Sequence, residues 1–118
     1  MHNKGGCPVP LRDWTTKRFR YGDNEFQLDK KGMEHILKRH HPKYWDGSVK
    51  KEQSFLDPKL SVDDLKHVVG EVMNQNRVTL LQNGIKHKYQ VTGTVNGVKY
   101  TLGMKKGGRV GQLYPVYE

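Results

Sequence analysis

The chain has 118 residues, with 21 lysines and arginines against 12 aspartates and glutamates, which gives a formal net charge of +9. This length suits one domain, and this charge favours a polyanionic partner: nucleic acid first, then an anionic membrane surface or an acidic protein. No apolar run approaches the ~20 residues of a membrane span, and no signal segment is apparent, so we expect no membrane insertion. The single cysteine, Cys7, excludes an intramolecular disulfide and a multi-cysteine metal site.

The first 25 residues are expected to precede the main domain, which we place at residues 26–118. Glycines and prolines in the first ten residues are typical of an extended leader or linker. The stretch Trp14–Tyr21 is basic and aromatic. Such a segment either stacks on a nucleic acid strand or covers a small core with its aromatic rings.

A helix is predicted over Met33–His41, with Asp29 as its cap and Pro42 as its end. Four of its residues have the i, i+3, i+4, i+7 spacing of a core-facing stripe: Met33, Ile36, Leu37 and His40. An imidazole in the last turn suits proton transfer, because the helix C-terminus favours its charged form. The alternative for His40 is a buried histidine that hydrogen-bonds a backbone carbonyl.

A second helix is predicted to begin at Ser61, with Asp64 completing a capping box, and to end near Asn74–Asn76. Its apolar stripe indicates packing on a flat apolar surface and consists of Val62, Leu65, Val68, Val69, Val72 and Met73. His67 comes one position before Val68, outside the stripe, and is expected at the surface.

From Thr79 the apolar pattern is interpreted as alternating with a period of two, as in strands. Asn96-Gly97 predicts a two-residue hairpin turn between Tyr89–Val95 and Val98–Met104. A turn at residues 105–108 then leads to a third strand, Arg109–Tyr114. The fold class predicted is α+β, with helices packed on a meander of three or four antiparallel strands.

The expected register gives the sheet one apolar face and one polar face. The hairpin turn pairs Val95 with Val98 and Val91 with Leu102. In the last strand, Leu113 is expected opposite Tyr100, Gln112 opposite Thr101, and Tyr114 opposite Lys99. The polar face then carries Lys88, Gln90, Thr92, Thr94, Lys99, Thr101 and Lys105.

Histidine beside such a face suits phosphodiester cleavage without a metal, although an ordinary solvated sheet face has the same composition. Metal ligation by the helix is disfavoured, because His35 and His40 project about 140° apart and do not converge. No metalloprotease, phosphate-loop or nucleophile-elbow motif is present.

Five segments together carry a family resemblance: Glu34–Trp45, Gln53–Phe55, the stripe from Val62, Gly93–Val98 and Gly108–Pro115. They resemble the C-terminal nuclease domains of bacterial polymorphic toxins. The likeness is to EndoU-like ribonucleases and related domains of LXG and contact-dependent growth inhibition toxins, and covers roughly residues 26–114.

The resemblance implies a metal-independent endoribonuclease with the barnase/EndoU/colicin/RelE type of fold. Such a domain belongs to a larger secreted or surface-delivered toxin and acts in the cytoplasm of the target bacterium. A cognate immunity protein, expected to be acidic, neutralises it in the producer. Similar helices also occur in RNase A-like toxin domains.

By this resemblance, His35 and His40 match the family's histidine-bearing helix, Ser54 its Ser-Phe element and Tyr114 its last-strand tyrosine. Gln112 occupies a position where related domains often carry a hydroxyl residue. Some relatives use a catalytic lysine, for which the candidates here are Lys50, Lys51, Lys99 and Lys105.

The leading hypothesis is therefore cleavage of RNA, tRNA being favoured, by attack of a ribose 2′-hydroxyl. His40 and His35 would transfer protons, while Tyr114 and Thr101 would position the phosphate. Substrate binding is assigned to Ser54, Gln112, Lys51, Lys99 and Lys105, and no cofactor or metal is expected. The alternatives are a non-catalytic basic nucleic-acid-binding module and a metal-dependent DNase toxin.

Overall fold

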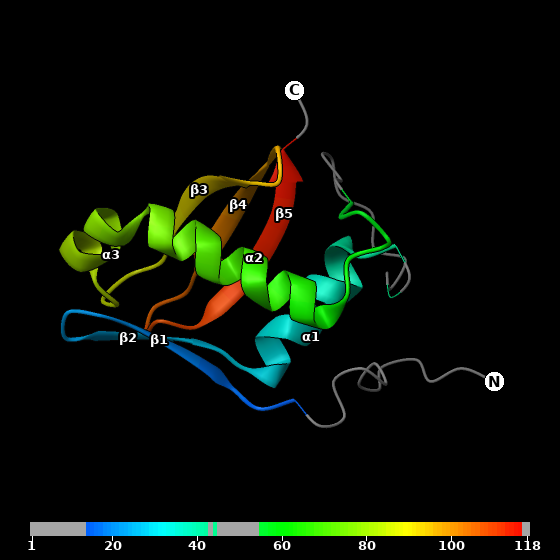
Figure 1. The fold of residues 1–118 in the computed structure, drawn as a ribbon. Coiled ribbons are helices and arrows are strands. Elements are labelled where there is room, and N and C mark those ends of the chain that lie inside the picture. The colour runs from blue at the N-terminus through cyan, green and yellow to red at the C-terminus, as the bar shows by residue number, and fades with distance from the viewer. Residues whose placement is uncertain (1–13, 43, 45–54, 117–118) are drawn as a thin grey trace.

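The computed structural model describes residues 14–42, 44 and 55–116, which form helices and antiparallel strands in one α+β arrangement (Figure 1). In chain order the elements are β1 (Lys17–Tyr21), β2 (Asn24–Leu28), α1 (Lys30–His40), α2 (Val62–Gln75), α3 (Arg77–Asn83), β3 (Tyr89–Val95), β4 (Val98–Met104) and β5 (Val110–Val116). The predicted α+β class and the three-stranded meander β3-β4-β5 are both confirmed.

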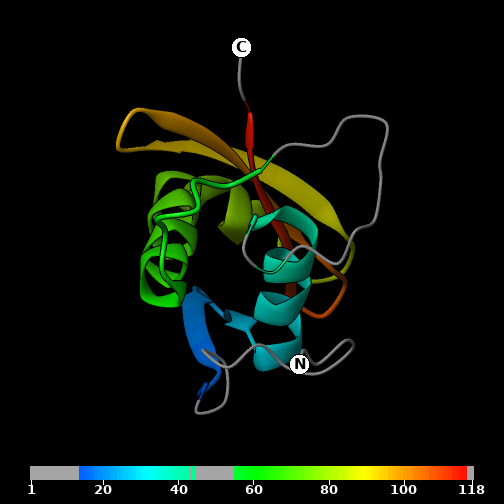
Figure 2. The same cartoon turned by 90° about the vertical axis from the view of Figure 1, so that its right-hand side faces the viewer.

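The elements pack in layers around the apolar face of the meander. Figure 1 shows α2 crossing this face and the β1–β2 hairpin lying beyond α2. In the turned view of Figure 2, α1 runs beside β5, the outer strand of the meander. No helix in the part of the chain that the structure describes has the length and apolar content to cross a membrane.

Helix α1 begins where the sequence predicted a cap. The Asp29 carboxylate accepts a hydrogen bond from the Gly32 amide at 2.7 Å, and its other oxygen lies 3.0 Å from Arg109 Nε. The predicted apolar stripe is buried together with Gly32. Gly32 lies so close to the Val110 carbonyl oxygen that no side chain fits between them. One end of α1 is thereby fixed to the start of β5.

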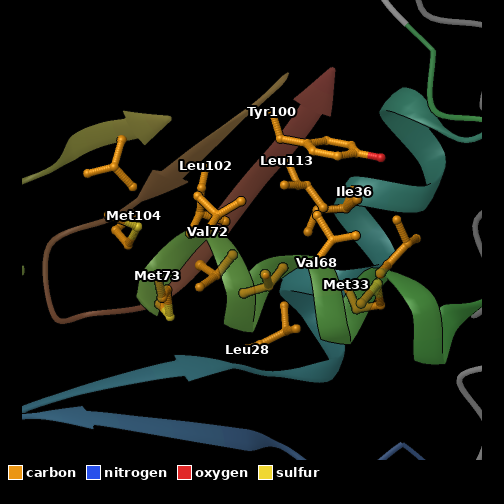
Figure 3. Packing of buried hydrophobic residues seen from close by; sticks show 14 of the residues in the cluster. Leu28, Met33, Ile36, Val68, Val72, Met73, Tyr100, Leu102, Met104 and Leu113 are labelled. Atoms are coloured by element: carbon orange, nitrogen blue, oxygen red, sulfur yellow. The ribbon is translucent and has the colours of Figure 1, made fainter. Parts of the chain in front are cut away.

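Helix α2 packs on the sheet as predicted and has the expected capping box, with Ser61 Oγ accepting from the Asp64 amide at 3.0 Å. Gly93 of β3 makes room for it, because a side chain there would meet Gln75 and the backbone of Val72. Figure 3 shows side chains of α2 packed among those of α1, β2 and the meander in the hydrophobic core. The fully buried residues include Leu28, Met33, Ile36, Leu37, Leu65, Val69, Val72, Met73, Leu102 and Leu113.

The hairpin of β3 and β4 has the predicted register. Val95 pairs with Val98, Val91 with Leu102, and Gly93 with Tyr100. The turn residues Asn96 and Gly97 both have positive φ, at 52° and 81°. The residue types that predicted this turn are the ones that adopt such a backbone at low cost.

The predicted register of the last strand is wrong by two residues. Leu113 pairs with Leu102, Gln112 with Gly103, and Tyr114 with Thr101. One of the two residues comes from a β-bulge: Met104 pairs with Val110, so Gly111 is an extra residue on β5. The other comes from the turn, which is closed by the Lys105 amide on the Arg109 carbonyl at 2.7 Å and is one residue shorter than predicted. Because the error is an even number, Gln112 and Tyr114 still lie on the polar face, as predicted.

The strand periodicity expected from Thr79 is also wrong, because residues 77–83 form helix α3. Its backbone hydrogen bonds run from the Leu80 amide to the Asn76 carbonyl and from the Gly84 amide to the Leu80 carbonyl, both 2.9 Å. Gly84 has φ 66° and ends this helix, so the Asn83-Gly84 pair marks a helix terminus.

The β1–β2 hairpin was not predicted, although its Gly22-Asp23 turn is a recognised hairpin signal. The expected domain boundary after residue 25 falls inside β2, and β1 pairs along its length with β2. This hairpin joins the rest of the fold through the Gln27 amide, which donates to the Gly108 carbonyl at 2.8 Å. Residues 17–25 therefore belong to the same folded unit as the meander.

Two helical glycines should respond oppositely to alanine. Gly32→Ala is expected to lower the free energy of unfolding by about 1–3 kcal/mol, because its methyl group must push the Val110 backbone away. Gly70→Ala should raise it by about 0.5–1 kcal/mol, because the nearest atom is Phe19 Cε2 at 3.5 Å and alanine favours the helix. Urea denaturation measures both; equal effects would contradict the tight contact between α1 and β5.

The capping box should make stability depend on pH. The Ser61 amide and hydroxyl hold the pKa of Asp64 below its ordinary value of 3.8, so the ionised carboxylate stabilises the fold at neutral pH. This contribution is lost as pH falls through the lower pKa of the folded state. Asp64→Asn should therefore destabilise at pH 7, with the difference from wild type shrinking below pH 3.8. The neighbouring exposed Asp63, replaced by asparagine, is the control in thermal unfolding, and a pH-independent Asp64→Asn penalty would contradict the cap.

Candidate functional site

The predicted histidine of α1 meets the predicted tyrosine of β5. The His40 and Tyr114 rings lie with centroids 5.2 Å apart, tilted by 30°. His40 is 8% exposed and Tyr114 is half-buried, so an imidazole and a phenol share one partly solvated place. They meet because α1 is anchored beside β5 at its other end, as described above.

A chain of polar groups extends from Tyr114 across the polar face. Thr101 is the pairing partner of Tyr114 on β4 and is itself buried. Gln90 Nε2 of β3 lies 3.4 Å from Tyr114 Oη and 3.1 Å from Gln112 Oε1. Gln90 was predicted only as a member of the polar face, and its bridging position depends on the bulge-shifted register.

An open groove of about 540 Å³ continues this surface beyond Gln112. Lys88, Gln90, Lys105 and Gln112 contribute to its lining, together with Gly103 and Gly111. At one side, burial raises the pKa of Tyr89 above 10.0, so its hydroxyl stays protonated and donates to the Gly84 carbonyl at 2.9 Å. Two of the predicted substrate-binding residues, Gln112 and Lys105, therefore lie in one groove.

The sheet lies in a part of the sequence without acidic residues. Residues 72–117 contain seven lysines and arginines and neither aspartate nor glutamate. In the described residues, every carboxylate belongs to the β1–β2 hairpin, to α1, to α2 or to the segments beside them. The net charge alone does not reveal this asymmetry, which lies in the positions of the acidic residues along the sequence. The asymmetry gives the meander a positive field.

The adjacent histidines have different environments. His41 is 1% exposed, and its Nε2 lies 2.9 Å from the Leu60 carbonyl oxygen. The Leu56 amide donates to the His40 carbonyl at 2.8 Å, so both contacts fix the chain before α2 to the end of α1. His41 is thus a buried histidine bonded to a backbone carbonyl, which makes it a structural residue.

The other predicted histidine does not share the site of His40. His35 is half-buried and lies outside the buried stripe of α1, about 140° around the helix from His40. Its predicted partnership with His40 in proton transfer is therefore not supported by a shared location. His35 and His40 remain separate candidates.

The remaining predicted site residues divide into two groups. Lys99 is exposed on β4, two positions before Thr101 and on the same face, while its strand neighbour on β5 is Val116. Ser54 and Lys51, like Lys50, lie outside the described residues.

The basic-aromatic segment Trp14–Tyr21 covers the core. Trp14, Phe19 and Tyr21 pack against it, and Trp14 Nε1 donates to the Leu28 carbonyl at 3.3 Å. The cations of β1 point outward, where Arg18 and Arg20 both lie 3.9 Å from the Glu25 carboxylate. The aromatic rings of this segment therefore cover the core, which is the second of the two roles considered for it.

Comparison of the chain with models of known protein families, with curated proteins and with solved structures finds no match. In the part of the chain that the structure describes, no three His, Cys, Asp or Glu side chains gather in a way that could hold a metal ion.

The structural role of His41 has a measurable consequence. His41→Ala removes a buried ring and leaves the Leu60 carbonyl without its partner, so the free energy of unfolding should fall by about 2–3 kcal/mol. His67→Ala, at an exposed position of α2, should change it by less than about 0.5 kcal/mol. Urea denaturation followed by circular dichroism measures both, and an unchanged midpoint for His41→Ala would contradict the role.

Proposed function

We propose that this chain is an endoribonuclease domain that cleaves RNA without a metal cofactor. The observation that supports it best is the pairing of His40 with Tyr114 at the edge of an acid-free polar sheet face. A titratable group, a phenol, amide groups and lysines thus line one positively charged surface. Those are the groups that general acid–base cleavage of a phosphodiester requires.

The proposed reaction is internal transfer at phosphorus. The ribose 2′-oxygen attacks the adjacent phosphorus, the bond from phosphorus to the 5′-oxygen breaks, and the products are a 2′,3′-cyclic phosphate and a 5′-hydroxyl end. One proton leaves the 2′-hydroxyl and another reaches the departing 5′-oxygen. His40 transfers one of these protons, a contribution of about 10²–10⁴-fold in rate.

Tyr114 and Thr101 are proposed to position the phosphate beside His40. The Tyr114 hydroxyl is oriented by Gln90 Nε2 at 3.4 Å, and Thr101 lies directly opposite on β4. Lys99 and Lys105 would add positive charge toward the two ends of the same face. His35 is retained as the candidate for the second proton, and its separation from His40 makes the single variants informative.

We further propose that the domain has the barnase/EndoU/colicin/RelE type of fold and acts as a toxin between bacteria. Helices followed by an antiparallel meander are compatible with the barnase/EndoU/colicin/RelE type of fold, and the motifs quoted above resemble polymorphic-toxin nucleases. On that basis the domain is delivered into a competing bacterium, and an acidic immunity protein covers the cationic sheet in the producer. Failure of the neighbouring gene's product to bind or protect would remove the immunity partner.

A second candidate is a nucleic-acid-binding module without catalysis. The same acid-free sheet supports it, because neutralising phosphates needs cations and no proton transfer. It predicts binding that weakens steeply with salt and does not depend on His40.

The deciding experiment is incubation of the full chain with total tRNA and rRNA in EDTA. Discrete fragments ending in cyclic phosphate are expected, and His40→Ala should lower the cleavage rate at least about 100-fold by removing a proton-transfer group. His67→Ala is the matched control, because it removes an exposed histidine of α2 and should leave the rate unchanged.

Two results would contradict the proposal. Intact RNA with tight, salt-sensitive binding would favour the non-catalytic module. Nuclease activity that appears only after a divalent metal is restored, particularly on DNA, would favour the metal-dependent DNase. His35→Ala, tested in parallel, lowers the rate only if its ring takes part in the chemistry or in folding, and circular dichroism separates the two.

A further inference from the structure

We propose that the groove lined by Lys88, Gln90, Gly103, Lys105, Gly111 and Gln112 is a subsite for one unpaired nucleobase, adjacent to the phosphate held at His40 and Tyr114. The inference rests on the proposed function for its substrate class. It adds that the chain binds a base, and not the sugar-phosphate backbone alone.

The first observation is space that the backbone does not require. Gly103 and Gly111 are absent from the glycines with positive φ, so other residues fit their backbone conformation. Side chains there would fill the groove: a Cβ at Gly103 would lie 2.9 Å from Gln112 Oε1, and one at Gly111 would lie 2.7 Å from Lys105 Cε. The two glycines therefore leave flat peptide surface open between flexible neighbours.

The second observation is a pair of amides at the groove wall. Gln90 Nε2 donates to Gln112 Oε1 at 3.1 Å, which orients the two side chains. Within the described residues, no further hydrogen bond occupies the side-chain carbonyl oxygen of Gln90 or the side-chain amino group of Gln112. An acceptor beside a donor matches the edge of a nucleobase, and that edge is available only when the base is unpaired.

The third observation is continuity with the reacting groups. Gln112 and Tyr114 lie on one face of β5 two residues apart, which is about 6.6–6.8 Å along a strand. Gln90 contacts both of them, and Tyr114 stacks near His40. Lys88 and Lys105 flank the groove without any acidic residue between positions 72 and 117, so an adjoining phosphate would be neutralised there.

The test measures binding, so it does not depend on cleavage. Fluorescent 2′-O-methyl RNA hexamers lack the attacking hydroxyl, and one base at a time is replaced by an abasic site. With the wild-type chain, removing the base at one position should weaken binding about tenfold, as the loss of two ordinary hydrogen bonds implies. Fluorescence anisotropy gives the dissociation constants.

Gly103→Val should abolish this position-specific penalty, because its side chain fills the groove. Gln112→Leu should abolish it by removing the hydrogen-bonding group while keeping similar bulk, and it serves if Gly103→Val does not fold. Thr92→Val, on the same polar face but outside the groove, should leave it unchanged. Two results would overturn the subsite. One is a penalty in Gly103→Val and Gln112→Leu as large as that in wild type, and the other is the absence of a penalty at every position in wild type.

The two proposals fail separately. Cleavage of tRNA that depends on His40 but shows no abasic penalty would leave the ribonuclease standing and remove the base subsite. A position-specific penalty in a chain that cleaves no RNA would leave the base subsite standing and remove the ribonuclease.

Discussion

The contact on which the rest of the structure depends is the one between the start of α1 and the start of β5. Asp29 caps the helix through the Gly32 amide and pairs with Arg109 with its other oxygen, while Gly32 lies directly against Val110. Because its first turn is fixed and its buried stripe packs along β5, the length of the helix determines where its last turn lies. Its 11 residues bring His40 beside Tyr114. The candidate site is thus positioned by a polar clamp and a glycine at the far end of the helix.

Because of that placement, the neighbouring residues His40 and His41 have different roles. His41 is buried and bonded to Leu60, so it stabilises the approach to α2, while His40 faces Tyr114 at the surface of the core. The meander divides in the same way: its apolar face packs under α2, and its other face carries amides, hydroxyls and lysines. Folding and the proposed chemistry therefore use alternate residues of the same strands.

Sequence patterns were sufficient wherever the determinant was local. Ser61 with Asp64, Asp29 before α1, and Asn96-Gly97 each specify a cap or turn within a few residues, and all were predicted correctly. One error was also local: Leu80 was expected in a strand, whereas its amide bonds the Asn76 carbonyl and its carbonyl accepts from the Gly84 amide, within one short helix. The register error arose where a neighbouring strand decides, because Gln112 pairs with Gly103 only when Gly111 is accommodated as a bulge. The approach of His40 to Tyr114 was likewise beyond local patterning, since it depends on Arg109 and Val110 contacting Asp29 and Gly32.

The bulge at Gly111 also determines how the site tolerates changes in chain length. Val110 pairs with Met104 and Leu113 with Leu102, so both reach the apolar face although an odd number separates them. Without the extra residue, continuous pairing from Val110 would turn Leu113 to the open face and Tyr114 into the core. Substitutions in β5 alter single contacts, whereas a one-residue insertion or deletion between Val110 and Gln112 exchanges the two faces of the strand that follows. The length of this segment is accordingly under a stricter constraint than most of its side chains.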